Sequence, residues 1–188
     1  MKKLILTVAL GVASVAAFAQ GTLNFANGGS GLVARVYQTD GTTGLSGSAW
    51  SADLYWAAGT VANSALLNPL GLPATFSTIA SQAGLFFGGP RTVPGAAGAS
   101  VITAQIRVWD TASGSSYAAA LANPGALVGE SILFQVTLAD PGLTPPGIPT
   151  TMTALNGHPW NVHVVPEPST LALAGLGLAG MMMLRRRK

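Results

Sequence analysis

Two apolar segments lie toward the ends of the chain, and they confine any water-soluble domain to about residues 20–164. Residues 4–18 are apolar or small throughout, and they follow Lys2 and Lys3. Residues 171–184 are again apolar or small, and a basic cluster follows them: Arg185, Arg186, Arg187 and Lys188. An apolar segment of this kind is buried in a core, inserted into a membrane, or removed after targeting.

The first segment has the organisation of a secretory signal peptide over residues 1–19. Lys2 and Lys3 form its positively charged start, and the apolar stretch is too short for a stable membrane anchor. Ala17 and Ala19 place small residues at the −3 and −1 positions before Gln20, as signal peptidase requires. The alternative is an N-terminal helix of the core. The pattern predicts export through the inner membrane, with signal peptidase as a partner.

Residues 165–188 combine a short rigid motif, an apolar helix and a basic tail. A helix over residues 169–184 would be about 24 Å long at ~1.5 Å per residue. The hydrocarbon core is roughly 30 Å thick, and flanking residues with local thinning absorb such a difference. The positive-inside rule keeps residues 185–188 in the cytoplasm, so the middle of the chain lies outside the inner membrane. The signal peptide predicts the same topology.

The motif of this tail is Pro166-Glu167-Pro168, in which two prolines hold the glutamate extended next to the apolar segment. The tail resembles the PEP-CTERM sorting signal of exopolysaccharide-producing Gram-negative bacteria. The resemblance implies recognition of Pro166, Glu167 and Pro168 by a membrane-embedded exosortase, which cleaves near the motif and releases or transfers the protein. The pattern does not define the scissile bond. A plain tail anchor with a chance Pro-Glu-Pro is the alternative.

The middle of the chain carries few charges. Only 8% of all residues are charged, against about 25% in ordinary soluble domains. Most basic residues lie at the two ends, and residues 20–165 hold just Arg35, Arg91 and Arg107 against five acids. The basic pI therefore belongs to the ends, and we expect no nucleic-acid partner. The chain has no cysteine, which excludes disulfides, thiol catalysis and cysteine-bound metals.

Short segments with alternating apolar residues recur through the middle, which is typical of half-buried strands. In Ser100–Asp110, the residues Ile102, Ala104, Ile106 and Val108 share one face. The segments with this pattern, the last two weaker, are 32–39, 49–56, 100–110, 131–139, 160–164, 75–79 and 85–87. They predict a mainly β fold, a single antiparallel β-sandwich or jelly-roll-like domain over residues 20–164. An alternative puts the final strand in a stalk outside it.

Turn residues and one alanine-rich segment divide these strands. Asp40-Gly41, Gly88-Gly89-Pro90 and Pro141-Gly142 predict turns. Tyr117–Ala122 predicts one or two helical turns. In 131–139, the residues Ile132, Phe134, Val136 and Leu138 are expected on the core side.

The residues needed for catalysis or metal binding are sparse. His158 and His163 are the two histidines, and no serine lies in a Gly-x-Ser-x-Gly elbow. Two histidines without cysteine make a poor zinc set, and no Asp-x-Asp run suggests calcium. We therefore expect no catalytic residues, no metal and no cofactor. An enzyme remains a third hypothesis, favoured if Asp53, Asp110 and Glu130 share one cleft.

One cluster of aromatic and acidic residues suggests sugar binding, because aromatic rings stack on sugar faces and a carboxylate accepts sugar hydroxyls. Asp53 is flanked by Trp50, Tyr55 and Trp56, and Trp109 follows Arg107 on one strand face. The candidate glycan contacts are Trp50, Asp53, Trp56 and Trp109. The alternatives are core and rim packing, and a solvent-facing pair for Arg107 and Trp109.

The leading hypothesis is a non-catalytic structural or adhesive component of the envelope or extracellular matrix, associated with exopolysaccharide and biofilm. A carbohydrate-binding module is the alternative.

Overall fold

The computed structural model describes residues 20–29 and 31–167, and in this part the chain is mainly β. The proposed signal peptide, Pro168, the apolar segment 169–184 and the basic tail lie outside the described residues. Among the residues described, no helix combines the length and the apolarity needed to cross a membrane.

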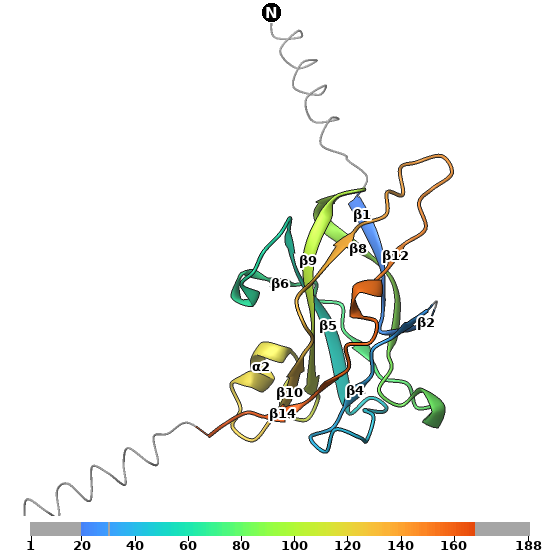
Figure 1. Ribbon diagram of the computed structural model, residues 1–188. Coiled ribbons are helices and arrows are strands. Elements are labelled where there is room, and N and C mark those ends of the chain that lie inside the picture. Colours follow the sequence, from blue (N-terminus) through green and yellow to red (C-terminus); the bar gives the residue numbers. More distant parts are fainter. Residues whose placement is uncertain (1–19, 30, 168–188) are drawn as a thin grey trace, which may run out of the picture.

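The larger sheet is built around two long antiparallel strands, β5 (Trp50–Ala58) and β9 (Val101–Asp110), which pair from Trp50↔Asp110 to Ala58↔Ile102 (Figure 1). The far edge of β9 pairs first with β10 (Leu127–Glu130) and then with β11 (Phe134–Thr137). The far edge of β5 pairs with β6 (Asn68–Pro69) and β7 (Ala74–Thr75), and β14 (His163–Val164) pairs with β10.

A second sheet and two small pairs complete the β structure. The sheet has the order β12–β1–β8, formed by Thr150–Thr151, Gln20–Ala26 and Phe87–Ala97. β2 (Gly28–Gly29) pairs with β3 (Leu32–Val33), and β4 (Val36–Tyr37) pairs with β13 (Trp160–Asn161). The pairs β1–β12 and β4–β13 are parallel, whereas the others are antiparallel as expected. Within residues 20–29 and 31–167, the helical elements are α2 (Tyr117–Leu121) and the 3₁₀ turns Ser64–Leu66, Ala80–Gln82 and Thr153–Leu155.

The main core draws on both larger sheets. Leu23 and Phe25 of β1 and Val93 of β8 are buried in one cluster with Leu54 of β5 and Ile106 of β9. The alternation expected in the two long strands is confirmed, because this cluster also contains Ala52, Ile102, Ala104 and Val108. Burial of such side chains is the main favourable term in folding, at about 25 cal/mol per Å² of apolar surface.

A second cluster covers the opposite face of the larger sheet, because α2 and the final segment pack there. Its buried members are Tyr55, Leu67, Trp109, Tyr117, Ala120, Ala126, Val128 and Val165. The solvent-facing pair considered for Arg107 and Trp109 is therefore wrong: Trp109 is 2% exposed and its indole N–H donates to the Gly114 carbonyl at 2.9 Å. The Arg107 side chain is 14% exposed.

The expected strand 131–139 is interrupted at its start. Ile132, predicted on the core side, is 44% exposed, and regular pairing begins at Phe134. Ser131 explains the break, since its N–H donates to the Ile106 carbonyl and its hydroxyl accepts the Ile106 N–H, both at 2.9 Å. The side chain thus substitutes for a backbone partner, and the alternation resumes with buried Phe134, Val136 and Leu138.

The turn expected at Gly88-Gly89-Pro90 is wrong, because these residues lie inside β8, where Gly89 and Pro90 pair with β1. A side chain at position 88 would place its Cβ 2.6 Å from a ring carbon of Phe25, so only glycine allows the two strands to approach. Gly89 has φ of +73° beside a register shift in the pairing, which is the conformation of a β-bulge. Gly88 thus allows the close approach of β1 and β8, and Gly89 allows the bulge.

The other expectations have mixed outcomes. The turns at Asp40-Gly41 and Pro141-Gly142 are confirmed, and α2 confirms the alanine-rich helix. Segment 32–39 is two short strands, β3 and β4, and segment 160–164 is β13 and β14. The stalk alternative is wrong, because both final strands pair with the domain and Trp160 and Val162 are buried in the main core.

Candidate functional site

The sorting motif begins where the folded domain ends. The Val165 N–H donates to the Ala126 carbonyl at 2.8 Å, and the Val165 carbonyl accepts the Gly125 N–H at 3.0 Å. The Val165 side chain is buried in the second cluster, whereas Pro166 and Glu167 are exposed. Proline has no N–H to donate and a fixed φ, so strand pairing does not continue through Pro166. Glu167 is therefore presented to solvent directly beside the domain.

A cleft of about 310 Å³ lies on the side of the larger sheet that carries the second cluster. One wall is the segment after β6, and the other is the N-terminal part of α2 with the loop before it. The lining residues are Asp53, Tyr55, Pro69, Gly71, Pro73, Trp109, Ser115, Ser116, Tyr117 and Ala118.

Asp53 is the carboxylate of this cleft, and it is 5% exposed. Its Oδ1 accepts the Leu54 N–H at 2.9 Å, and its Oδ2 accepts the Gly71 N–H at 3.0 Å. Burial raises the pKa of Asp53 above its ordinary value, and the backbone hydrogen bonds oppose that rise. The side chain thus ties the loop after β6 to β5.

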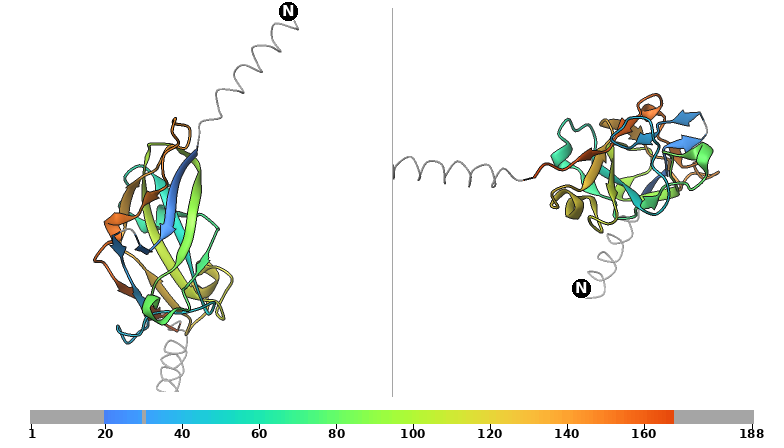
Figure 2. Two further views of the ribbon diagram at one scale, coloured as in Figure 1. Left: turned by 90° about the vertical axis from the view of Figure 1, so that its right-hand side faces the viewer. Right: turned by 90° about the horizontal axis from the view of Figure 1, so that it is seen from below.

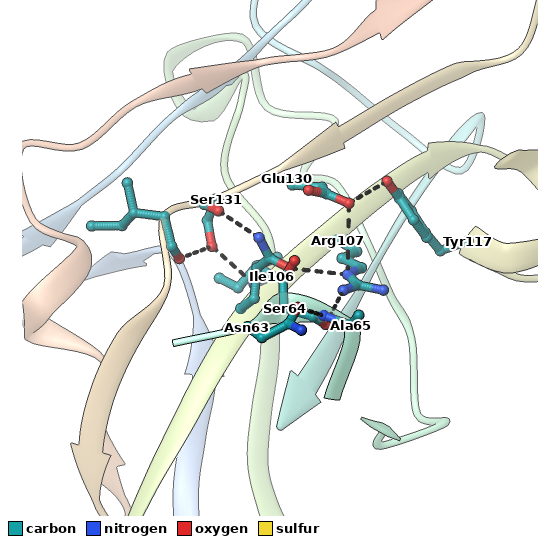
Figure 3. A network of polar contacts seen from close by, with 10 residues as sticks. Asn63, Ser64, Ala65, Ile106, Arg107, Tyr117, Glu130 and Ser131 are labelled. Atoms are coloured by element: carbon teal, nitrogen blue, oxygen red, sulfur yellow. Dashed lines mark hydrogen bonds and ion pairs between the residues drawn. The ribbon is translucent and has the colours of Figure 1, made fainter. Parts of the chain in front are cut away.

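Arg107 lies beside the cleft residues in a network of polar contacts (Figure 3). Its Cζ is 4.2 Å from the ring centroid of Tyr55 and 5.2 Å from that of Tyr117. Its Nε donates to Gln105 Oε1 at 3.0 Å and its Nη2 to the Ser64 carbonyl at 2.8 Å. The guanidinium therefore joins β9 to β5, to α2 and to the 3₁₀ turn at Ser64–Leu66.

Glu130 completes the network from β10. Its Oε1 accepts the Tyr117 hydroxyl at 2.6 Å and lies 3.8 Å from Arg107 Nε. Burial and the hydrogen bond to Glu130 raise the pKa of Tyr117, so the phenol stays protonated and donates at neutral pH. The network holds α2 against the sheet.

The four candidate glycan contacts are divided between the two faces of the larger sheet. Asp53 and Trp109 line the cleft together. Trp50 and Trp56 are partly buried against the main core, on the opposite face of β5. Tyr55 and Tyr117 also line the cleft and were not proposed as contacts. The position of Tyr55, two residues after Asp53 on the same strand face, is the sequence signal that could have indicated it.

The remaining acids and the histidines lie elsewhere. Asp110 accepts the N–H groups of Ser113 and Leu127; burial acts to raise its pKa, but these hydrogen bonds together lower it. His158 and His163 are exposed on the final segment. Over residues 20–29 and 31–167, no group of three or more His, Asp or Glu side chains is placed to hold a metal ion.

The fold and the junction define a mainly β domain, and Pro166 and Glu167 lie beyond its last hydrogen-bonded residue, Val165. The PEP-CTERM protein-sorting motif matches residues 164–188. The chain is therefore a PEP-CTERM domain-containing protein, an exosortase substrate that is exported through a membrane-associated sorting system. No curated protein and no solved structure matches the chain.

Proposed function

We propose that this protein is a non-catalytic structural or adhesive component of the cell envelope or extracellular matrix, associated with exopolysaccharide. The observation that supports a structural role is the engagement of all four aspartates, each of which accepts backbone N–H groups. The pairs are Asp40 with Thr42 and Thr43, Asp53 with Leu54 and Gly71, Asp110 with Ser113 and Leu127, and Asp140 with Gly142. These carboxylates brace turns and loops.

The protein reaches the envelope or the extracellular matrix by export, membrane anchoring and processing of its tail. Residues 1–19 act as a signal peptide that is removed after Ala19. Residues 169–184 hold the chain in the inner membrane with residues 185–188 in the cytoplasm, until exosortase acts near Pro166, Glu167 and Pro168. The domain, in which the two larger sheets share one core as in a β-sandwich, is then retained at the surface or in the matrix.

The role is tested in a native host by deleting the gene and complementing it with the wild-type chain or with a chain that lacks residues 168–188. We expect the deletion to lower the shear needed to detach surface-grown cells, and the wild type alone to restore it. Restoration by the chain without the tail would contradict a role that depends on sorting. Turnover of a glycan or peptide by the purified protein, abolished by replacing one acid or histidine, would contradict the non-catalytic assignment.

A carbohydrate-binding module is the second candidate, and one observation favours it. Asp53 and Trp109, which the sequence suggested as glycan contacts, line one cleft with Ser115 and Ser116. Oligosaccharides from the host matrix would be titrated into the wild type, Asp53→Asn and the control Asp140→Asn. Binding by the wild type and the control, but not by Asp53→Asn, would support this candidate. Absence of binding, or equal binding by all three, would count against it.

A further inference from the structure

The chain leaves the folded domain beside α2. Val165 is hydrogen-bonded to Gly125 and Ala126, in the turn that joins α2 to β10. In Figures 1 and 2, the red end of the described chain lies at the same end of the domain as the yellow α2. The start of β1 and the orange loop 140–149 lie at the opposite end (Figures 1 and 2). We call residues 111–126, which form α2 and its flanking loops, the exit surface.

The exit surface has a distinctive composition. Residues 111–126 contain no Asp, Glu, Lys, Arg or His. Its exposed residues include Leu121, which is 48% exposed, with Ala118, Ala119, Ala122 and Pro124. On β14, Val164 adds a further exposed aliphatic side chain at 53%. An uncharged surface of small, aliphatic and hydroxyl side chains pays little desolvation free energy on approaching a lipid headgroup layer.

The length of the connection limits how far this surface can lie from the membrane. Three residues, Pro166, Glu167 and Pro168, separate Val165 from residue 169, where the proposed membrane segment begins. Fully extended chain spans at most ~3.6 Å per residue, so this connection reaches about 14 Å. The headgroup region of one leaflet is roughly 5–8 Å thick. The end of the domain therefore lies within a few ångströms of the headgroups.

We propose that, before exosortase acts, the exit surface rests on the headgroup layer of the outer leaflet of the inner membrane. The partner is the lipid surface, and the contact depends on the tether, so it is lost when the tail is cut. This inference rests on the membrane segment included in the proposed function. In the unprocessed protein, the domain is then oriented with α2 toward the membrane and loop 140–149 away from it. This orientation is lost after processing.

The absence of cysteine allows a direct test. Leu121→Cys carries an environment-sensitive fluorophore on the exit surface, and Ile148→Cys carries it in loop 140–149, where Ile148 is 87% exposed. The chain from Gln20 to Lys188 is reconstituted in phosphatidylethanolamine and phosphatidylglycerol vesicles with a headgroup spin-labelled lipid. We expect several-fold stronger quenching at L121C than at I148C, and none at either site when a chain ending at Glu167 is added to the same vesicles.

Equal quenching at the two sites of the inserted chain would overturn the proposal. A change in the fluorescence at L121C that appears only when exosortase is reconstituted with the chain would also overturn it, because the partner of the exit surface would then be the enzyme. Alkaline carbonate extraction separates these failures from failure of the proposed anchor. If carbonate extracts the chain from the vesicles, the proposed membrane segment is wrong, and so is the proposed lipid contact. If the chain resists extraction and the fluorophore at L121C is unquenched, only the proposed lipid contact is wrong.

Discussion

At the scale of single residues, Arg107 makes the contacts on which the second cluster depends. It packs against two tyrosine rings that also contact each other, and it donates to the Gln105 side chain and the Ser64 carbonyl. We predict that Arg107→Ala lowers the free energy of unfolding by roughly 2–4 kcal/mol, because it leaves partly buried acceptors unpaired and a cavity beside the two rings. Urea denaturation followed by tryptophan fluorescence measures the change.

Glu130→Gln is the matched control for this substitution. The variant keeps an acceptor for the Tyr117 hydroxyl and removes only the ion pair of 3.8 Å with Arg107. A partly exposed pair of this kind contributes less than about 1 kcal/mol. An equal loss in the two variants would show that the charge pair, rather than the stacking and neutral hydrogen bonds of Arg107, holds the cluster together.

Asp53 carries a prediction about pH. Burial raises the pKa of Asp53 in the folded state above its value in the unfolded chain. Between these two pKa values, the folded protein therefore binds more protons at Asp53 than the unfolded chain does. Asp53 therefore favours folding increasingly as pH falls through the folded pKa toward the unfolded one. Measured from pH 7 to pH 4, the wild type should gain stability relative to Asp53→Asn. A difference that stays constant or shrinks would contradict the raised pKa.

At the scale of elements, the break between β10 and β11 depends on Ser131. Its hydroxyl accepts the buried Ile106 N–H, which has no strand partner there. We predict that Ser131→Ala destabilises the protein by about 1–3 kcal/mol, the cost of an unpaired buried donor. Thr137→Ala, an exposed position on β11, should change stability by less than about 0.5 kcal/mol. Comparable losses in the two variants would argue against a special role for the Ser131 hydroxyl.

The two long central strands could be predicted, whereas the second sheet could not. β5 and β9 alternate over many residues, so the local pattern indicates both the strand and its core face. β8 contains Gly88, Gly89 and Pro90, which indicate a turn until the close approach to Phe25 is known. The core position predicted for Ile132 was wrong because of another long-range contact. Ser131, whose side chain interrupts the strand, is hydrogen-bonded to Ile106, which is far away in the sequence.

The cleft shows the same limit for the candidate site. Asp53 and Trp109 could be singled out by residue type. Their neighbours Gly71 and Tyr117 come from a loop and a short helix whose positions follow from tertiary packing. Trp50 and Trp56 lie on the other face of β5 because of the strand period of two, which separates them from Asp53.

At the scale of the whole molecule, the folded unit extends to Val165. Chains ending at Glu167 and at Val162 separate the two sides of this boundary. The first should unfold like the full-length domain, whereas the second should lose at least about 2 kcal/mol, because it lacks the buried Val165 side chain and its hydrogen bonds to Gly125 and Ala126. Equal denaturation midpoints would show that the final strand is dispensable.

The sorting tail was predictable from sequence because its parts are contiguous: motif, apolar segment and basic cluster follow one another within residues 165–188. The match to the PEP-CTERM motif over residues 164–188 confirms it. The structure adds that Glu167 is exposed and lies only two residues after Val165, the last residue that is hydrogen-bonded to the domain. Processing at the motif therefore does not require the domain to unfold.

We expect the sorting motif, whose Pro166 and Glu167 are exposed beyond the folded domain, to direct processing of the exported protein. The most direct measurement is the intact mass of the mature protein, with cell fractionation, for the wild type, Glu167→Ala and the control Asp140→Asn in a native host. We predict that the wild type and the control begin at Gln20, lose Arg185–Lys188 and leave the inner membrane, whereas Glu167→Ala keeps the tail there. Retention of the tail by all three in the inner membrane would contradict it.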